Sequence, residues 1–200
     1  MSAEIARRAA GKTALLVIDM ITDLDFAQGA AIRDKAEALA GRIAALAAQA
    51  RMAGVPVVYV NDNYGQWHSE RSRLIAHCLR PDSRGRDVVR RLLPQEDDYF
   101  VIKPQFSGFY ATNLPVLLPK LGASRLILTG IAADMCVLFT AADAHMRDYA
   151  LWVPADCVAS ASDDHAGWAL ESMRSSMEAQ IADSGGDALA RWIAAGERDG

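Results

Sequence analysis

The chain has 200 residues, of which 52% are hydrophobic and 23% are charged, so it can bury one substantial core. Its 21 Lys and Arg and 25 Asp and Glu give a net charge of −4, and the densest basic group, residues 80–91, is interrupted by Asp82 and Asp87. This balance argues against nucleic acid or an anionic membrane as partner. The sequence has no apolar run of membrane-spanning length and no hydrophobic signal core in its first residues, so we expect a cytoplasmic protein.

The three cysteines, Cys78, Cys136 and Cys157, lie far apart in the sequence and form no CxxC pair. A disulfide scaffold needs more cysteines than this, and a reducing cytosol keeps such residues as thiols. For Cys157, in the segment PADCVAS, a small buried hydrophobic role is favoured, and Cys78 lies in a polar region with no partner in view. Cys136 is the cysteine whose surroundings suggest a chemical role.

Short apolar runs alternate with amphipathic segments along the whole chain. We expect strands over residues 13–19, 55–61, 99–104, 124–130 and 150–156, and helices over residues 32–53, 87–94, 113–121, 135–148, 163–177 and 187–195. Residues 62–82 are predicted to form a loop in which a helical turn can occur, and residues 178–183 are a candidate sixth strand. This alternation predicts a single domain over residues 1–200: a three-layer, doubly wound α/β/α fold with about six mainly parallel strands.

Ligands of such sheets bind outside the carboxyl ends of the strands, which directs attention to the residues there. Asp19 ends the first predicted strand, Lys103 ends the third, and Cys136 follows the fourth after the turn GIAAD. Each has an ordinary alternative when taken alone: a capped turn residue, a surface lysine and a buried thiol. Their placement at one predicted edge instead favours a common site.

The three groups have complementary chemistry. A neighbouring cation and a helix N-terminus both lower the pKa of a thiol, so Lys103 and a helix beginning near residue 135 are expected to favour the Cys136 thiolate. Asp19 can accept the thiol proton, and backbone N–H groups of the segment IAADMC can bind an oxyanion. A dyad of Cys136 with His68 or His165 is the weaker alternative, because no spacing supports it.

Three segments resemble the isochorismatase-like cysteine hydrolases, a superfamily that includes nicotinamidases, N-carbamoylsarcosine amidohydrolases and ureidoacrylate amidohydrolases. They are ALLVIDMITDLDF, VIKPQFSGFYATNL and LILTGIAADMCVLFTAADAHMRDY, and the similarity runs from about residue 13 to residue 160. The resemblance implies that Asp19, Lys103 and Cys136 are catalytic. It also implies a cis peptide bond between Ile131 and Ala132, an oxyanion hole made by the N–H groups of Ala132 and Cys136, and a homo-oligomer.

The sequence also departs from members of this superfamily. Nicotinamidases carry an Asp-x-His metal motif after the second strand, whereas Asn61-Asp62-Asn63 stands here, and Asp62 with His68 is too small a ligand set for a transition metal. We therefore expect no metal and no cofactor. Loop position alone makes a set of aromatic residues candidates for the pocket wall: Phe26, Trp67, Phe106, Phe109 and Tyr110.

These features predict a hydrolase that cleaves the C–N bond of a small amide or ureide through a thioester on Cys136. Isochorismatases proper hydrolyse a vinyl ether and lack a cysteine at this position, so vinyl-ether hydrolysis is an alternative. A non-catalytic binding domain on the same scaffold is another. Dinucleotide binding is the weakest, because DMITDLDF follows the first strand where a GxGxxG motif would be required.

Overall fold

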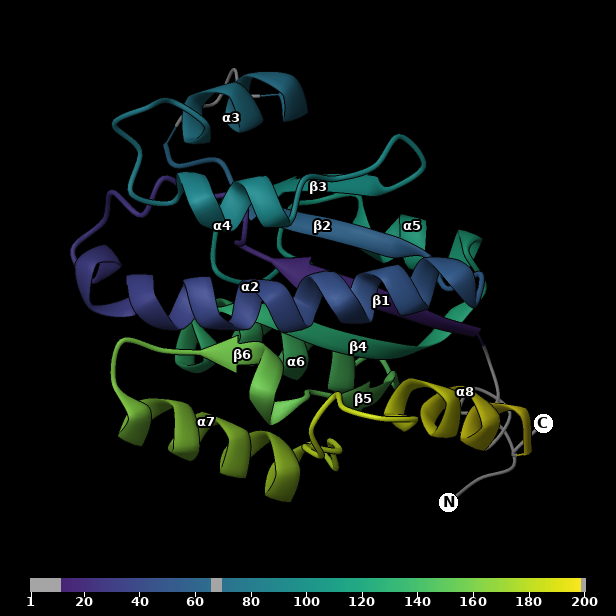
Figure 1. The fold of residues 1–200 in the computed structure, drawn as a ribbon. Coiled ribbons are helices and arrows are strands. Elements are labelled where there is room, and N and C mark those ends of the chain that lie inside the picture. The colour runs from purple at the N-terminus through teal and green to yellow at the C-terminus, as the bar shows by residue number, and fades with distance from the viewer. Residues whose placement is uncertain (1–11, 66–69, 199–200) are drawn as a thin grey trace.

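The computed structural model describes residues 12–65 and 70–198 (Figure 1). Parallel strands form one sheet in the order β3-β2-β1-β4-β5, and a short strand β6 pairs with the carboxyl end of β4. The strands are β1 (Lys12–Ile18), β2 (Val57–Asp62), β3 (Tyr99–Lys103), β4 (Ala123–Ile131), β5 (Ala150–Trp152) and β6 (Val158–Ala159). This architecture confirms the predicted α/β class and the mainly parallel sheet.

Helices cover both faces of the sheet. One face packs against α2 (Gly29–Met52), α3 (Arg71–Cys78), α4 (Arg86–Arg91) and α8 (Ala188–Arg198). The other packs against α5 (Leu114–Lys120), α6 (Leu138–His145) and α7 (Asp163–Ser176). Because side chains alternate across a strand, Leu15 and Val17 of β1 enter the first core while Leu16 and Ile18 enter the second. The continuous apolar run of β1 is therefore explained by burial on both faces.

Helix α2 shows how the sequence sets one of these layers. Its buried positions recur every three or four residues, and they include Ile32, Ala36, Leu39 and Ile43. The helix begins at Gly29, three residues before the predicted start, where a side chain would collide with the backbone of Leu24. In Figure 1, α2 runs along the length of the sheet from the carboxyl edge toward α8. Among the described residues, no helix has the length and apolar character needed to cross a membrane.

Two predicted strands are wrong in extent or place. Strand β5 ends at Trp152 rather than residue 156, because Pro154 lacks an N–H and a 3₁₀ turn over Ala155–Cys157 follows it. Residues 178–183 form no strand beyond an isolated bridge between Trp152 and Gln180, and the sixth strand is β6 instead. Both differences arise at the end of the sheet where pairing with β4 is divided between β5 and β6.

Candidate active site

The predicted strand-end residues come together at the carboxyl edge of the sheet. The Nζ atom of Lys103 lies 2.9 Å from Oδ2 of Asp19 and 3.4 Å from Sγ of Cys136. The Lys103 side chain is fully buried, and that of Asp19 is 10% exposed. A lysine is buried in this way only when it is paired, so the ion pair accounts for its position.

Strand register and one strained residue place the Asp19 carboxylate. In the register, Ile18 of β1 lies between Val60 of β2 and Gly130 of β4. Asp19 then turns to a φ of 52°, a region that non-glycine residues seldom adopt and that is typical of functional sites. Its backbone N–H donates to the carbonyl of Val60, and its Oδ1 accepts the backbone N–H of Asp62 at 2.7 Å.

Gly130 permits the close approach of β1 and β4 beside this carboxylate. Its φ is 114°, and a Cβ atom at this position would lie 1.9 Å from the carbonyl oxygen of Ile18. Only glycine fits both requirements. The glycine that precedes the turn of Cys136 thus has a structural reason in the packing of the two strands.

Cys136 lies in a turn that begins with a cis peptide bond between Ile131 and Ala132. Residues Ala133–Val137 form a π-helical turn, and α6 continues from Leu138, so the predicted single helix over 135–148 is divided and starts earlier. The carbonyl of Ala132 accepts the N–H groups of Met135 and Val137. Such single π turns are often found at functional sites.

A hydrogen-bond cluster supports this turn from β6 and α7. The Ser160 hydroxyl donates to the Asp134 carboxylate at 2.5 Å and accepts the Asp134 backbone N–H at 3.2 Å. His165 lies 3.1 Å from the same carboxylate through Nδ1. The imidazole of His165, predicted as an alternative partner of Cys136, is therefore paired with Asp134 at the surface.

Burial and neighbouring charge set the protonation of the triad. Burial raises the pKa of Asp19, and the nearby Lys103 ammonium only partly opposes this. Burial also raises the pKa of the Cys136 thiol, and the Asp19 carboxylate raises it further. Burial lowers the pKa of Lys103, but Asp19, Cys136 and Asp62 together outweigh burial and raise it. This direction is opposite to the predicted lowering of the thiol pKa: burial and the Asp19 carboxylate favour the neutral thiol of Cys136 over the thiolate.

A pocket of about 280 Å³ opens over Cys136. Phe26 and Phe106 line it, as predicted from loop position. The remaining lining residues come mainly from the ends of β1, β2 and β4 and from the start of α2: Asp19, Thr22, Gln28, Ile32, Asp62, Tyr64, Ile131, Ala132, Met135 and Cys136. The carboxyl-end rule could have identified Thr22 and Asp62, which closely follow or end strands.

Two other predicted wall residues do not line this pocket. Phe109 is buried in the core, 6.0 Å from the ring of Tyr149, because the loop after β3 turns it inward over α6. Tyr110 is 59% exposed and is not among the lining residues. Trp67 and His68 lie outside the described residues.

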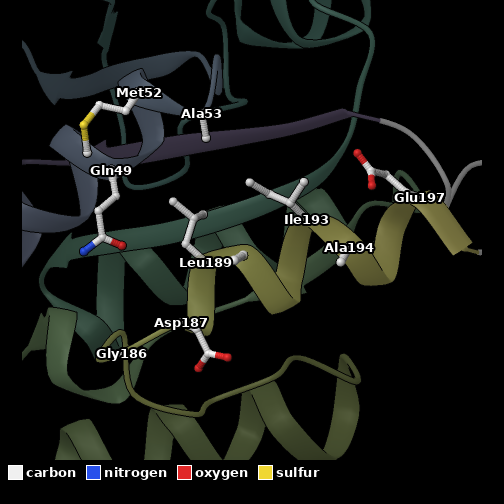
Figure 2. A pocket seen from close by; sticks show the side chains of 10 residues that line it. Gln49, Met52, Ala53, Gly186, Asp187, Leu189, Ile193, Ala194 and Glu197 are labelled. Atoms are coloured by element: carbon white, nitrogen blue, oxygen red, sulfur yellow. The ribbon is translucent and has the colours of Figure 1, made fainter.

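A larger hollow of about 480 Å³ lies elsewhere, between the end of α2 and α8 (Figure 2). Leu189 and Ile193 of α8 face Met52 and Ala53 across it, and Asp187 lies at its rim. Its lining contains none of the strand-end residues. It lies at the opposite, amino edge of the sheet, away from Cys136.

The described residues also show how the segment after β2 differs from a metal site. Asp62 faces Lys103, with its Oδ2 3.4 Å from Nζ, and the Asn63 side chain accepts the Gly65 N–H. No group of three or more His, Cys, Asp or Glu side chains within the described ranges is arranged to hold a metal ion. Among the described residues, the donor set at Asp62 does not fit a transition metal, which needs about four N, S or O ligands.

The two other cysteines are buried away from the pocket. Burial raises the pKa of both Cys78 and Cys157 to about 12, so each is a thiol at neutral pH. The Cys157 thiol lies 3.3 Å from the Ser184 hydroxyl. The predicted burial of Cys157 is confirmed.

Comparison with known proteins gives a consistent result. The chain is 40% identical over 168 residues to the uncharacterized isochorismatase family protein YaaI of Bacillus subtilis, covering 84% of this chain and 92% of that protein. It is 32% identical over 182 residues to the ureidoacrylate amidohydrolase RutB of Serratia proteamaculans, covering 78% and 73%. The crystal structure of N-carbamoylsarcosine amidase from Thermoplasma acidophilum superposes with a TM-score of 0.69 at 32% identity, covering 88% and 98%.

These relatives with assigned activities are amidohydrolases, which act on C–N bonds. The isochorismatase domain model matches residues 13–184, which is most of the chain and includes every residue described at the site. The protein therefore belongs to the isochorismatase family of hydrolases.

Proposed function

We propose that the protein hydrolyses the C–N bond of a small amide or ureide through a covalent thioester on Cys136. One observation carries the proposal: the Lys103 ammonium lies within 3.4 Å of both the Asp19 carboxylate and the Cys136 sulfur, beneath a pocket onto which the thiol opens. An acid–base group, a cation and a nucleophile in direct contact are the groups that acyl transfer requires.

The first half of the reaction forms the thioester. Asp19 takes the Cys136 proton as the sulfur attacks the substrate carbonyl, and a C–S bond forms while the carbonyl π electrons move to oxygen. The backbone N–H groups of Ala132 and Cys136 stabilise this oxyanion. As the carbonyl re-forms, the C–N bond breaks and Asp19 returns its proton to the departing nitrogen, so ammonia or an amine leaves.

The second half regenerates the thiol. Asp19 takes a proton from a water molecule, whose oxygen attacks the thioester carbonyl. The tetrahedral species then collapses, the C–S bond breaks, and the proton on Asp19 returns to sulfur as the carboxylic acid leaves. Lys103 stays charged throughout and offsets the negative charge that passes between sulfur and the Asp19 carboxylate.

The raised pKa of the Cys136 thiol is consistent with this role of Asp19. A thiol that is neutral at rest must lose its proton as it attacks, so a hydrogen-bonded base is needed. Asp19 is the hydrogen-bonded carboxylate, and its own raised pKa brings its basicity closer to that of the group it deprotonates. The pair transfers a proton within the site rather than storing a thiolate.

The test is a screen of small amides and ureides for ammonia release, followed by mass spectrometry of the intact protein during turnover. Wild type should show a covalent adduct of the acyl group on Cys136, and Cys136→Ala should show neither adduct nor turnover while it unfolds like wild type. Cys157→Ala removes a buried thiol outside the pocket and should keep full turnover. Amide hydrolysis by Cys136→Ala at the wild-type rate would refute the thioester mechanism.

The same variants separate the vinyl-ether alternative. A vinyl-ether hydrolase would release product from isochorismate, and this activity would survive the loss of Cys136. A non-catalytic domain would show no turnover of any substrate, and its Cys136 would not react with a thiol-directed electrophile at neutral pH.

A further inference from the structure

A second carboxylate, Asp62, lies at the pocket and has no part in the mechanism above. Its side chain is 28% exposed, and it ends β2 beside Lys103 in the register of β2 and β3. The backbone around it holds it in place, because its N–H donates to Asp19 and its Oδ1 accepts the N–H of Tyr64 at 2.7 Å. Its Oδ2 is 3.4 Å from the Lys103 ammonium, a longer contact than the 2.9 Å of Asp19.

The charged side chains among the described lining residues of this pocket are both acidic. Asp19 and Asp62 both line it, whereas Lys103 is fully buried and is not part of the lining. Among the described lining residues there is no Arg, Lys or His. A ligand carboxylate in this space would face two carboxylates and no cation among the described lining residues, and like charges at short range in a partly buried site repel strongly.

The rest of the lining is suited to an apolar body. Phe26, Ile32, Phe106, Ile131 and Met135 are large apolar members of the wall, and Thr22 and Gln28 add neutral polar groups. Neutral apolar groups gain free energy by entering such a wall, whereas a charged group there loses its hydration. Apolar walls with a few fixed acceptors favour a small uncharged ligand that carries N–H donors.

We propose that Asp62 is a substrate-binding residue that accepts an N–H of the substrate, and that it makes the pocket selective for small uncharged amides with an apolar body over amides that carry a carboxylate. This inference rests on the proposed function, because it takes the amide to be the group that reacts with Cys136. Asp62 is held by its backbone contacts at the end of β2 and lines the same pocket as Cys136, so its Oδ2 is the acceptor that we assign to the substrate N–H.

The test uses two alkylating reagents of nearly equal size, iodoacetamide and iodoacetate, which differ in charge. In each reaction the sulfur of Cys136 displaces iodide, and the thiol proton leaves to Asp19 or to solvent. The rate of modification at Cys136 is followed by peptide mass spectrometry, and the ratio of the two rates is divided by the same ratio for free 2-mercaptoethanol. This normalised ratio cancels any change in the reactivity of the thiol itself.

In wild type, the normalised ratio of the iodoacetamide rate to the iodoacetate rate should be at least about 10. Asp62→Asn keeps the shape of the side chain and removes its charge, and it should reduce this preference by about fivefold or more. Asp187→Asn removes the same charge from an exposed position at the opposite edge of the sheet and should leave the preference unchanged (Figure 2). Equal normalised rates in wild type, or a preference that Asp62→Asn does not change, would overturn the proposal.

A matched pair of amides then tests the substrate class. Benzamide and 4-carbamoylbenzoate share the same ring and amide and differ by one carboxylate. Wild type should have the higher kcat/KM for benzamide, and Asp62→Asn should narrow the difference; a preference for 4-carbamoylbenzoate would overturn the assigned selectivity while leaving amide hydrolysis intact. If neither amide is hydrolysed, the alkylation ratios still decide the role of Asp62, and Cys136→Ala with other amides decides the proposed function.

Discussion

Replacing Lys103 by methionine tests the electrostatic centre of the site. The change keeps an unbranched side chain of similar length and removes the charge that contacts both Asp19 and Asp62. Two carboxylates, one of them buried, then share the site without a cation. We expect a loss of amide turnover together with a large loss of stability.

The size of the stability loss follows from the distances. At an effective dielectric constant of about 20, a contact of 2.9 Å corresponds to an attraction of about 6 kcal/mol and one of 3.4 Å to about 5 kcal/mol. The desolvation of the buried charges offsets most of this. Removing one partner of a buried pair costs about 3 to 5 kcal/mol, because the remaining charge is left uncompensated.

A second effect of Lys103→Met is a change in how the free energy of unfolding depends on pH. Without Lys103, the folded-state pKa of Asp19 rises further above its ordinary value of 3.8, since Lys103 is the main group that lowers it. The folded state of Lys103→Met then binds the Asp19 proton more tightly than the unfolded chain does. Its free energy of unfolding therefore falls as pH rises from the unfolded-state pKa of Asp19 to the folded-state pKa. The cost of Lys103→Met should therefore be smaller at pH 5 than at pH 7.

Urea unfolding of four proteins measures these effects: wild type, Lys103→Met, Asp19→Asn and the double variant. The double variant should be more stable than Lys103→Met alone, because it also removes a buried charge that lacks its partner. Lys120→Met, at an exposed position, is the control and should change the unfolding free energy by less than about 0.5 kcal/mol. If Lys103→Met costs under about 1 kcal/mol and the Asp19→Asn cost simply adds to it, the ion pair does not organise the site.

Two further predictions concern protonation and packing. Because burial raises the pKa of Asp19 and the proposed base must be ionised, kcat/KM should fall on acidification with an apparent pKa above 3.8; a pH–rate profile with that limb at or below 3.8 would contradict the assignment. Gly130→Ala should lower the unfolding free energy in urea by about 3 kcal/mol or more, because of the 1.9 Å contact with the Ile18 carbonyl and the positive φ. Gly41→Ala, in α2 with no atom near the new Cβ, should instead raise it by about 0.5 to 1 kcal/mol, and a similar loss in both variants would refute the packing argument.

Local patterns in the chain were sufficient to predict the fold class and the proposed triad. Strand β1 is recognisable as a buried strand from its continuous apolar run ALLVI, and α2 is recognisable as a helix from its three-to-four-residue repeat. Once the strands are parallel, their carboxyl ends must meet at one edge, which brings Asp19, Lys103 and Cys136 together. Homo-oligomerisation, a cytoplasmic location and a single domain over the full length stay predictions.

Other features depend on contacts that no local pattern contains. The role proposed for Asp62 depends on its register opposite Lys103, which is a property of strand pairing rather than of either segment. Phe109 and Phe106 lie three residues apart in one loop, yet one enters the core and the other the pocket, according to how the loop packs on α6. Aromatic residues in a loop therefore could not be assigned to the wall from position alone.

The amino-acid sequence specifies which chemical groups lie at the strand ends. Its hydrophobic periodicity also specifies a parallel sheet, in which these ends share one edge. The protonation state of those groups is instead set by the folded arrangement. Burial and the Asp19 carboxylate raise the pKa of the Cys136 thiol, against the lowering expected from a neighbouring lysine and a helix start. A pKa depends on distances and desolvation in three dimensions, whereas spacing along the chain specifies only which groups are available.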